Sequence, residues 1–189
     1  MDINKLQDDF KLLRDHCIII RRNYNTYTNL FFQGNDELLL KVAWRFFNDI
    51  AEIMCRDWIL QVCKLMDPAE YKFKNQNISI TLIDTQLRIH NLQSPEMVTV
   101  SDELCKYGSK LIPARNKRIA HFDREQHLIG LILGETTEEE LLSFIKNIQH
   151  YCDLVGNAIG IGPLDFSGSG SSGDELDLIT VLRKIYDGK

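Results

Sequence analysis

The sequence predicts an all-α fold, a bundle of about five or six helices. Apolar residues recur at steps of three and four along several stretches, as they do in helices with one buried face. Two further stretches open with residues that favour helix starts, at Ser94-Pro95-Glu96 and at Thr136-Thr137. A chain of 189 residues is long enough to bury a sizeable apolar core.

The first predicted helix covers residues 3–22 and has a single apolar stripe. The stripe is formed by Ile3, Leu6, Phe10, Leu13, Cys17 and Ile20. Tyr24, Tyr27 and Phe31 continue it through a segment that Asn and Thr residues weaken. Gly34 is the expected stop, because glycine readily takes the left-handed conformation found at helix ends.

The second predicted helix, residues 36–66, is apolar nearly all round, so we expect it to be central and covered on several sides. Asn35 or Asp36 is its expected cap. It should end at Asp67-Pro68, because proline disfavours the helical conformation in the residue before it. Arg56-Asp57 on this helix could orient an active site, but we interpret it as an ordinary pair of surface charges.

The later helices are defined mainly by their ends. Residues 77–90 fit a helix that starts at Asn77 or Ser79, although their β-branched residues also fit a strand. A helix starting at Ser94-Pro95 should reach about Ile112, where Pro113 must kink or end it. The last long helix should run from a capping box at Thr136 or Thr137 to about Ile159. Three glycines stand near or just after its end, and we interpret them as helix-end and close-packing residues: Gly156, Gly160 and Gly162.

We divide the chain into a helical domain at 1–165, a flexible Gly/Ser linker at 166–174 and a C-terminal amphipathic helix at 175–189. The apolar residues assigned to that last helix are Leu178, Val181, Leu182 and Ile185. We expect it to dock on the rest of the chain or on a partner.

Composition narrows the choice of function. The net charge of -5 argues against a protein that coats nucleic acid non-specifically, yet it leaves room for a local basic groove. The five cysteines are odd in number and none forms a CxxC pair, which indicates a reduced, cytoplasmic protein. The chain opens with acidic residues rather than a secretory signal, and no apolar run approaches the roughly 20 residues of a membrane span.

The chemistry concentrates in one cationic stretch, from Arg115 to His121. A guanidinium stabilises phosphate charge through paired hydrogen bonds. An imidazole titrates near neutral pH and can move protons. Arg115 and His121 are six positions apart, about 240° around an ideal helix, so they would not share a face. Either the backbone turns between them or they meet through a second copy of the chain.

A positive strip could surround this point, although a solvated helix face explains such a run equally well. Its members would be Lys106, Lys110, Arg115, Lys117 and Arg118. A metal site at His121, Asp123 and His127 matches no familiar ligand spacing, so we expect no metal and no cofactor. We interpret His16, His90 and His150 as structural or surface residues.

Arg115-Asn116, four further residues and His121 together resemble the signature of the HEPN superfamily, and more specifically of the abortive-infection U (AbiU2) type. Three other pieces match in order, and with the signature they span most of the chain: Leu65-Met66-Asp67-Pro68-Ala69, Asn77-Ile78-Ser79 and Gly173-Asp174-Glu175-Leu176. The resemblance implies a HEPN-like helical bundle that forms a homodimer with the motif in the cleft between subunits.

The resemblance also implies a metal-independent endoribonuclease with a phage-defence or toxin role. Its implied catalytic residues are Arg115, Asn116 and His121, and the candidates for binding flanking RNA phosphates are Lys110, Lys117 and Arg118. An antitoxin or nucleotidyltransferase partner is implied as well. Asp123 stands where HEPN toxins silenced by nucleotide transfer usually carry a tyrosine, which speaks against that form of silencing. The alternatives are a non-catalytic module that binds RNA or protein, and a protein that binds a small nucleotide in the same groove.

Overall fold

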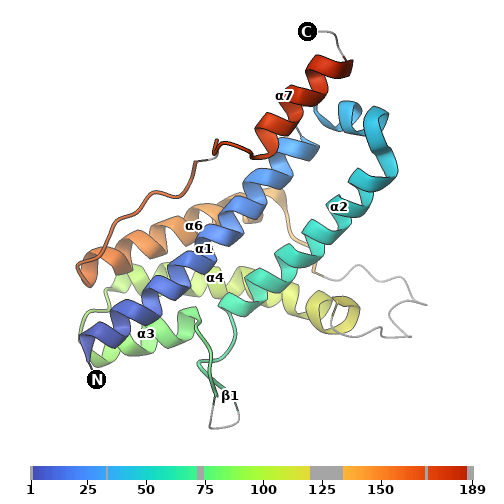
Figure 1. Cartoon of the computed structure of the whole chain (residues 1–189). Coiled ribbons are helices and arrows are strands. Elements are labelled where there is room, and N and C mark those ends of the chain that lie inside the picture. Colours follow the sequence, from blue (N-terminus) through green and yellow to red (C-terminus); the bar gives the residue numbers. More distant parts are fainter. Residues whose placement is uncertain (1, 33, 72–74, 120–133, 169, 187–189) are drawn as a thin grey trace. The chain divides into compact units, whose positions relative to one another are not determined.

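The computed structural model describes residues 2–32, 34–71, 75–119, 134–168 and 170–186. Within these ranges the protein is all-helical apart from one short hairpin, as predicted (Figure 1). The α-helices are α1 (Ile3–Phe31), α2 (Asp36–Leu65), α3 (Ile80–Ile89), α4 (Pro95–Ala114), α6 (Glu138–Ala158) and α7 (Glu175–Tyr186). A π-helical turn, η1 (Arg115–Ile119), continues α4, and strands β1 (Glu70–Tyr71) and β2 (Asn75–Gln76) pair antiparallel.

The chain forms two compact units. The first combines Met1–Ile18 with Ile59–Phe166, and the second combines Ile19–Trp58 with Ser167–Lys189. Helices α1 and α2 each contribute residues to both units. The predicted division at residues 165 and 175 stays a prediction.

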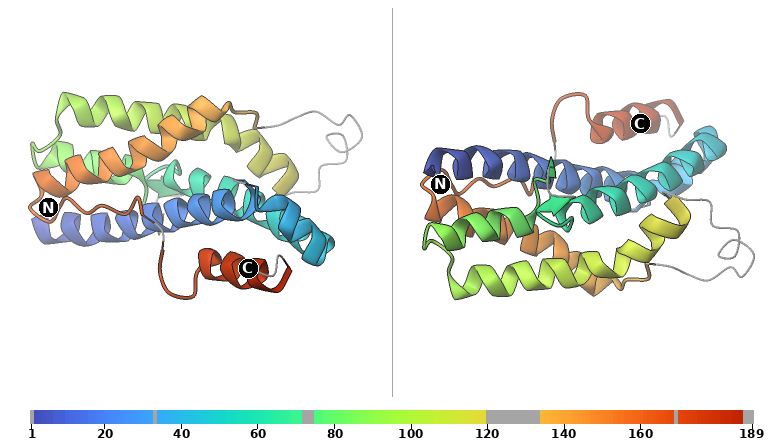
Figure 2. Two further views of the ribbon diagram at one scale, coloured as in Figure 1. Left: turned by 90° about the horizontal axis from the view of Figure 1, so that it is seen from above. Right: turned by 90° about the horizontal axis from the view of Figure 1, so that it is seen from below.

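The core of the first unit contains the stripe predicted for the start of α1. Leu6, Phe10 and Leu13 are fully buried, while Ile3 at the end of the stripe is 37% exposed. Helices α4 and α6 lie side by side in both views of Figure 2. The rings of Tyr107 on α4 and Phe144 on α6 stack with centroids 4.5 Å apart, which joins these two helices through their buried faces.

Side-chain caps begin three of these helices where the sequence predicts them. Ser79 caps α3, so the helix prediction for residues 77–90 is confirmed and the strand alternative is wrong. Ser94 caps α4 with Pro95 in the first turn. Thr137 and Glu140 form a capping box at α6, in which each accepts a hydrogen bond from the other's backbone N–H at 3.2 Å.

A carboxylate inside the first unit joins three helices. Asp84 on α3 accepts a hydrogen bond of 2.7 Å from the hydroxyl of Tyr151 on α6 and another from Ser101 on α4. Burial raises the pKa of Asp84, and these two hydrogen bonds oppose the rise. The network aligns α3, α4 and α6 at one level of the core.

The glycines in the last turn of α6 and just after it have the roles predicted for them. A Cβ on Gly156 would lie 2.9 Å from the Cα of Gly162, so the chain folds back directly against the helix here. Gly160 has a φ of +77°, the left-handed conformation that ends a helix.

The second unit holds a small core between the end of α1, the start of α2 and α7. The buried residues of this core are Leu30, Leu39, Phe47 and Ile179. Glu175 at the start of α7 accepts hydrogen bonds from Thr26 at 3.0 Å and from Asn29 at 2.7 Å, both on α1. The expectation that the C-terminal helix docks on the rest of the chain is therefore met within this unit.

Only part of the apolar surface of this last helix meets the small core. Leu182 packs against the small core, but the fully buried residue is Ile179. Leu178, Val181 and Ile185 are 42%, 52% and 66% exposed. The helix carries apolar residues on two sides, and only one side meets the core.

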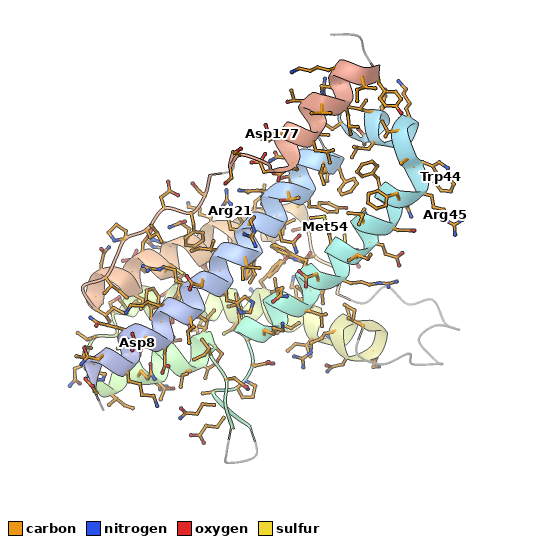
Figure 3. The ribbon with its side chains drawn as sticks, viewed as in Figure 1. Asp8, Arg21, Trp44, Arg45, Met54 and Asp177 are labelled. Carbon is orange, nitrogen blue, oxygen red and sulfur yellow. The ribbon has the colours of Figure 1, made fainter. Side chains whose placement is uncertain are left out.

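The prediction that α2 is covered on several sides is wrong for its first half. The backbone leaves helical geometry at Ala43 (φ -160°, ψ 66°). Leu40, Trp44 and Phe46 around this bend are more than half exposed, and Figure 3 shows Trp44 and Arg45 directed away from α1. The start of α2 shares its small core with the end of α1 and with α7. Two neighbouring segments are too few to cover a helix that is apolar all round.

Candidate functional site

The cationic stretch lies where α4 gives way to η1, in the first unit. Lys110 lies on α4, and Arg115, Asn116 and Lys117 lie on η1. Arg118 also belongs to η1, but its side chain is outside the described residues, as is all of His121. The alternative metal ligands Asp123 and His127 lie outside them too.

The helix changes from α to π geometry shortly after Pro113. Proline lacks the N–H that an α-helix needs, and its ring crowds the carbonyl four residues earlier. Helix α4 continues one residue past Pro113 to Ala114, and the next five residues form the wider π-turn. Single π-turns of this kind often occur at functional sites. The candidate catalytic arginine therefore lies on a non-standard turn rather than in a loop.

Arg115 is held by two side chains. Its Nη1 donates to Oδ1 of Asp67 at 2.9 Å, and its Nε donates to Oδ1 of Asn116 at 3.0 Å. The side chains of Arg115 and Asp67 are 29% and 32% exposed, so both reach solvent from a partly buried position. Asn116 is itself exposed. The predicted residues Arg115 and Asn116 are thus brought together by the structure.

Sequence reasoning missed Asp67 as a member of this site. Asp67 follows α2 and is separated from Arg115 by 48 positions. The available signal was its place in the Leu65–Ala69 piece of the family resemblance. No local spacing links the two residues, because the contact depends on how the residues after α2 lie beside η1.

A buried thiol lies close to the same ion pair. Cys63 in the last turn of α2 is 1% exposed. Burial raises the pKa of the Cys63 thiol, with Arg115 lowering it and Asp67 raising it. A neutral thiol is therefore favoured here, which argues against Cys63 as a nucleophile.

Lys110 has a partner of its own. It forms an ion pair with Glu140, the residue of the α6 capping box, and this contact holds the pKa of Glu140 below its ordinary value. The pair lines a pocket of about 210 Å³ between α4 and α6. Lys106 and Asn147 also line this pocket. Lys117 is exposed. Of the predicted positive strip, Lys110 and Arg115 are thus paired with carboxylates.

Three of the pieces that carry the family resemblance meet in space in the first unit: Leu65–Ala69, Asn77–Ser79 and the stretch that starts at Arg115. The side-chain Nδ2 of Asn77 donates to the carbonyl of Pro68 at 2.9 Å, and its backbone N–H donates to the carbonyl of Ala69 at 3.0 Å. Asp67 in turn bonds Arg115. One chain of contacts thus runs from the residues before α3 to the cationic stretch.

The remaining predicted residues have ordinary structural roles. Arg56 forms an exposed ion pair with Glu52, and Asp57 accepts a hydrogen bond of 3.0 Å from Asn23. His150 pairs with Glu96 at 2.9 Å on the surface. The described cysteines are all free thiols, and no group of three described His, Cys, Asp or Glu residues could hold a metal ion. None of the helices in the described ranges has the length and apolar character that crossing a membrane requires.

An all-helical protein with an Arg-Asn pair on a π-turn, held by an acidic residue that follows another helix, is compatible with a HEPN domain. The HEPN_AbiU2 family model, described as AbiU2, matches residues 3–178. The chain therefore belongs to the AbiU2 family of HEPN proteins. Neither the curated proteins nor the solved structures contain a match to it.

Proposed function

We propose that this protein is a metal-independent endoribonuclease with a phage-defence or toxin role in the cytoplasm. The observation that carries the proposal is the restrained Arg115 guanidinium, bonded to Asp67 and Asn116 beside the solvent. A fixed donor set acts on a developing phosphate charge without having to reorganise during the reaction. Membership of the AbiU2 family supports the same class of activity.

The proposed reaction is transphosphorylation. The ribose 2′-hydroxyl attacks the adjacent phosphorus as His121 accepts its proton. The bond from phosphorus to the 5′-oxygen breaks, and the His121 of a second copy protonates that oxygen. The products are a 2′,3′-cyclic phosphate and a 5′-hydroxyl. The reaction needs no metal-activated water, because the nucleophile belongs to the substrate.

The other residues of the stretch receive supporting roles in this proposal. Arg115 stabilises the charge on the phosphate, and Asn116 holds Arg115 through its side-chain oxygen. Lys117 and Arg118 bind flanking phosphates, and Lys110 does so by exchanging Glu140 for RNA. A homodimer would place two copies of the motif in one cleft and supply both histidines. An antitoxin or a nucleotidyltransferase would restrain the activity in the cell.

The identity of the product ends tests this proposal. We expect cleavage of a mixed-sequence RNA in the presence of EDTA, with products that end in 2′,3′-cyclic phosphate. The same sequence made with a single 2′-deoxyribose at each cleavage position should resist, since the internal nucleophile is missing. Cleavage of the deoxy-substituted strand, or products with 3′-hydroxyl ends, would contradict the mechanism.

A second candidate is a non-catalytic module that binds RNA or protein. The observation in its favour is charge: the chain carries a net charge of -5, and Asp67 and Glu140 offset Arg115 and Lys110. This candidate predicts RNA binding without cleavage, unchanged when His121 is replaced by alanine.

A further inference from the structure

Hydrogen bonds hold the backbone on both sides of Asp67. Its own N–H donates to the carbonyl of Lys64 at 3.3 Å, at the end of α2. Pro68 follows and restricts the conformation of Asp67 to the extended region. Beyond Pro68, Asn77 bonds the carbonyls of Pro68 and Ala69 at 2.9 and 3.0 Å. The Asp67 carboxylate therefore extends from a rigid turn.

The turn is also packed against the helix that leads to Arg115. A Cβ on Gly108 of α4 would lie 2.3 Å from Cγ of Met66, so the Met66 side chain lies directly against α4 at this glycine. Met66 directly precedes Asp67. Asp67 therefore follows a residue that is packed on the helix leading to Arg115.

The contact uses only part of the guanidinium. Arginine offers five N–H donors in a planar fork. Nη1 bonds Asp67 and Nε bonds Asn116, and no described residue accepts from Nη2. Only one oxygen of Asp67 takes part. A carboxylate that masked the arginine would favour the paired, two-bond geometry instead, so this single bond orients the fork without using all of its donors.

We propose that Asp67 is a positioning residue for the ribonuclease reaction, which holds Arg115 with its outer edge toward the scissile phosphate. The inference rests on the proposed function. The opposite role, a latch that cancels the charge of Arg115 until RNA displaces it, uses the same ion pair and makes opposite predictions.

Two substitutions distinguish these roles. Asp67→Asn keeps an oxygen that can accept from Nη1 but removes the charge, whereas Asp67→Ala removes both. If Asp67 positions Arg115, Asp67→Ala lowers kcat by about 100-fold and Asp67→Asn by about 10-fold or less, with KM changed by less than about 3-fold. If Asp67 is a latch, both variants bind RNA more tightly, because both lose the charge.

The experiment measures steady-state cleavage of RNA in EDTA by wild type and both variants, together with the affinity for an uncleavable 2′-O-methyl RNA. Glu52→Gln and Glu52→Ala are matched controls, since Glu52 pairs with Arg56 at an exposed position. They should leave kcat and affinity unchanged. Tighter RNA binding by both Asp67 variants, or kcat equal to that of wild type, overturns the inference while wild-type cleavage still supports the proposed function. An inactive wild type overturns the proposed function itself.

A second measurement is made on the wild-type protein and does not use the Asp67 variants. In ¹⁵N-detected spectra of the wild type, the Nε–H of Arg115, assigned by its loss in Arg115→Lys, should exchange with water more slowly than that of Arg56. Equal exchange rates would show that Arg115 is not held, and would overturn the inference.

Discussion

Nη1 of Arg115 lies 2.9 Å from Oδ1 of Asp67, which joins the π-turn after α4 to the end of α2 across 48 positions of sequence. This contact links two of the pieces on which the family resemblance rests. Asn77 extends the link to a third piece through Pro68. These three pieces are distant in sequence but are neighbours in the first unit.

Replacing Arg115 with lysine should be nearly as harmful to cleavage as replacing it with alanine. Lysine keeps the charge but has no planar fork, so it cannot bond Asp67 and Asn116 and still offer an edge to phosphate. We expect kcat to fall by about 100- to 1000-fold in both variants. Single-turnover cleavage of a labelled RNA measures this. A lysine variant with near-wild-type kcat would show that charge alone is sufficient.

Asp84 should make stability depend on pH with a particular sign. Burial raises its pKa in the folded protein above the ordinary value of 3.8. As pH rises through the interval between the unfolded and folded pKa values, the unfolded chain loses this proton first, so the contribution of Asp84 to stability is lost with rising pH. Urea unfolding of wild type and Asp84→Asn between pH 3.5 and 7 checks this.

The Asp84→Asn variant should therefore gain stability relative to wild type as pH rises. Its side-chain oxygen can still accept from Tyr151. Asp84→Ala provides the contrast, because it leaves the buried Tyr151 hydroxyl without this acceptor and should cost about 1–3 kcal/mol. If Asp84→Asn instead loses stability relative to wild type as pH rises, the assigned sign is refuted.

The start of each main helix could be predicted because its cause is local. Ser94 and Thr137 cap the helices that follow them, and proline or glutamate beside them strengthens the signal. The strand alternative at 77–90 arose because β-branched residues fit both structures, and the Ser79 cap decided the outcome. A helix start that depends on neighbouring residues can therefore be predicted from a single sequence.

Two features could not be predicted because their causes are not local. On α7, the stripe through Val181 and Ile185 has the same helical spacing as the buried side through Ile179, so periodicity could not choose between them. At the site, the partner of Arg115 depends on how the residues after α2 lie beside α4 and η1. Asp67 could be recognised only by its place in a family pattern.

The buried side of α7 can be tested by comparing two apolar truncations. Ile179→Ala should destabilise the second unit by about 2–4 kcal/mol, because Ile179 is buried in its small core. Val181→Ala, at a position 52% exposed, should cost less than about 0.5 kcal/mol. Hydrogen exchange of residues 175–186 reports on both. Equal effects would show that α7 docks through another face.

Gly156 should not tolerate a methyl group. An alanine Cβ would lie 2.9 Å from the backbone of Gly162, and a backbone contact cannot be relieved by a rotamer change. We expect a loss of about 1–3 kcal/mol despite the higher helix propensity of alanine. Gly168→Ala is the control, since nothing lies within 4 Å of its added Cβ. Thermal melts compare the two, and a Gly156→Ala melt at or above that of wild type would refute the close approach.

The central claim is that Arg115 and His121 carry out metal-independent cleavage of RNA. The most direct measurement incubates one mixed-sequence RNA in EDTA with wild type, Arg115→Ala, His121→Ala and the control Glu52→Gln, each shown to be folded. We expect cyclic-phosphate products from wild type and Glu52→Gln, and none above background from the other two. Equal cleavage by all four proteins, or intact RNA in every reaction, would contradict it.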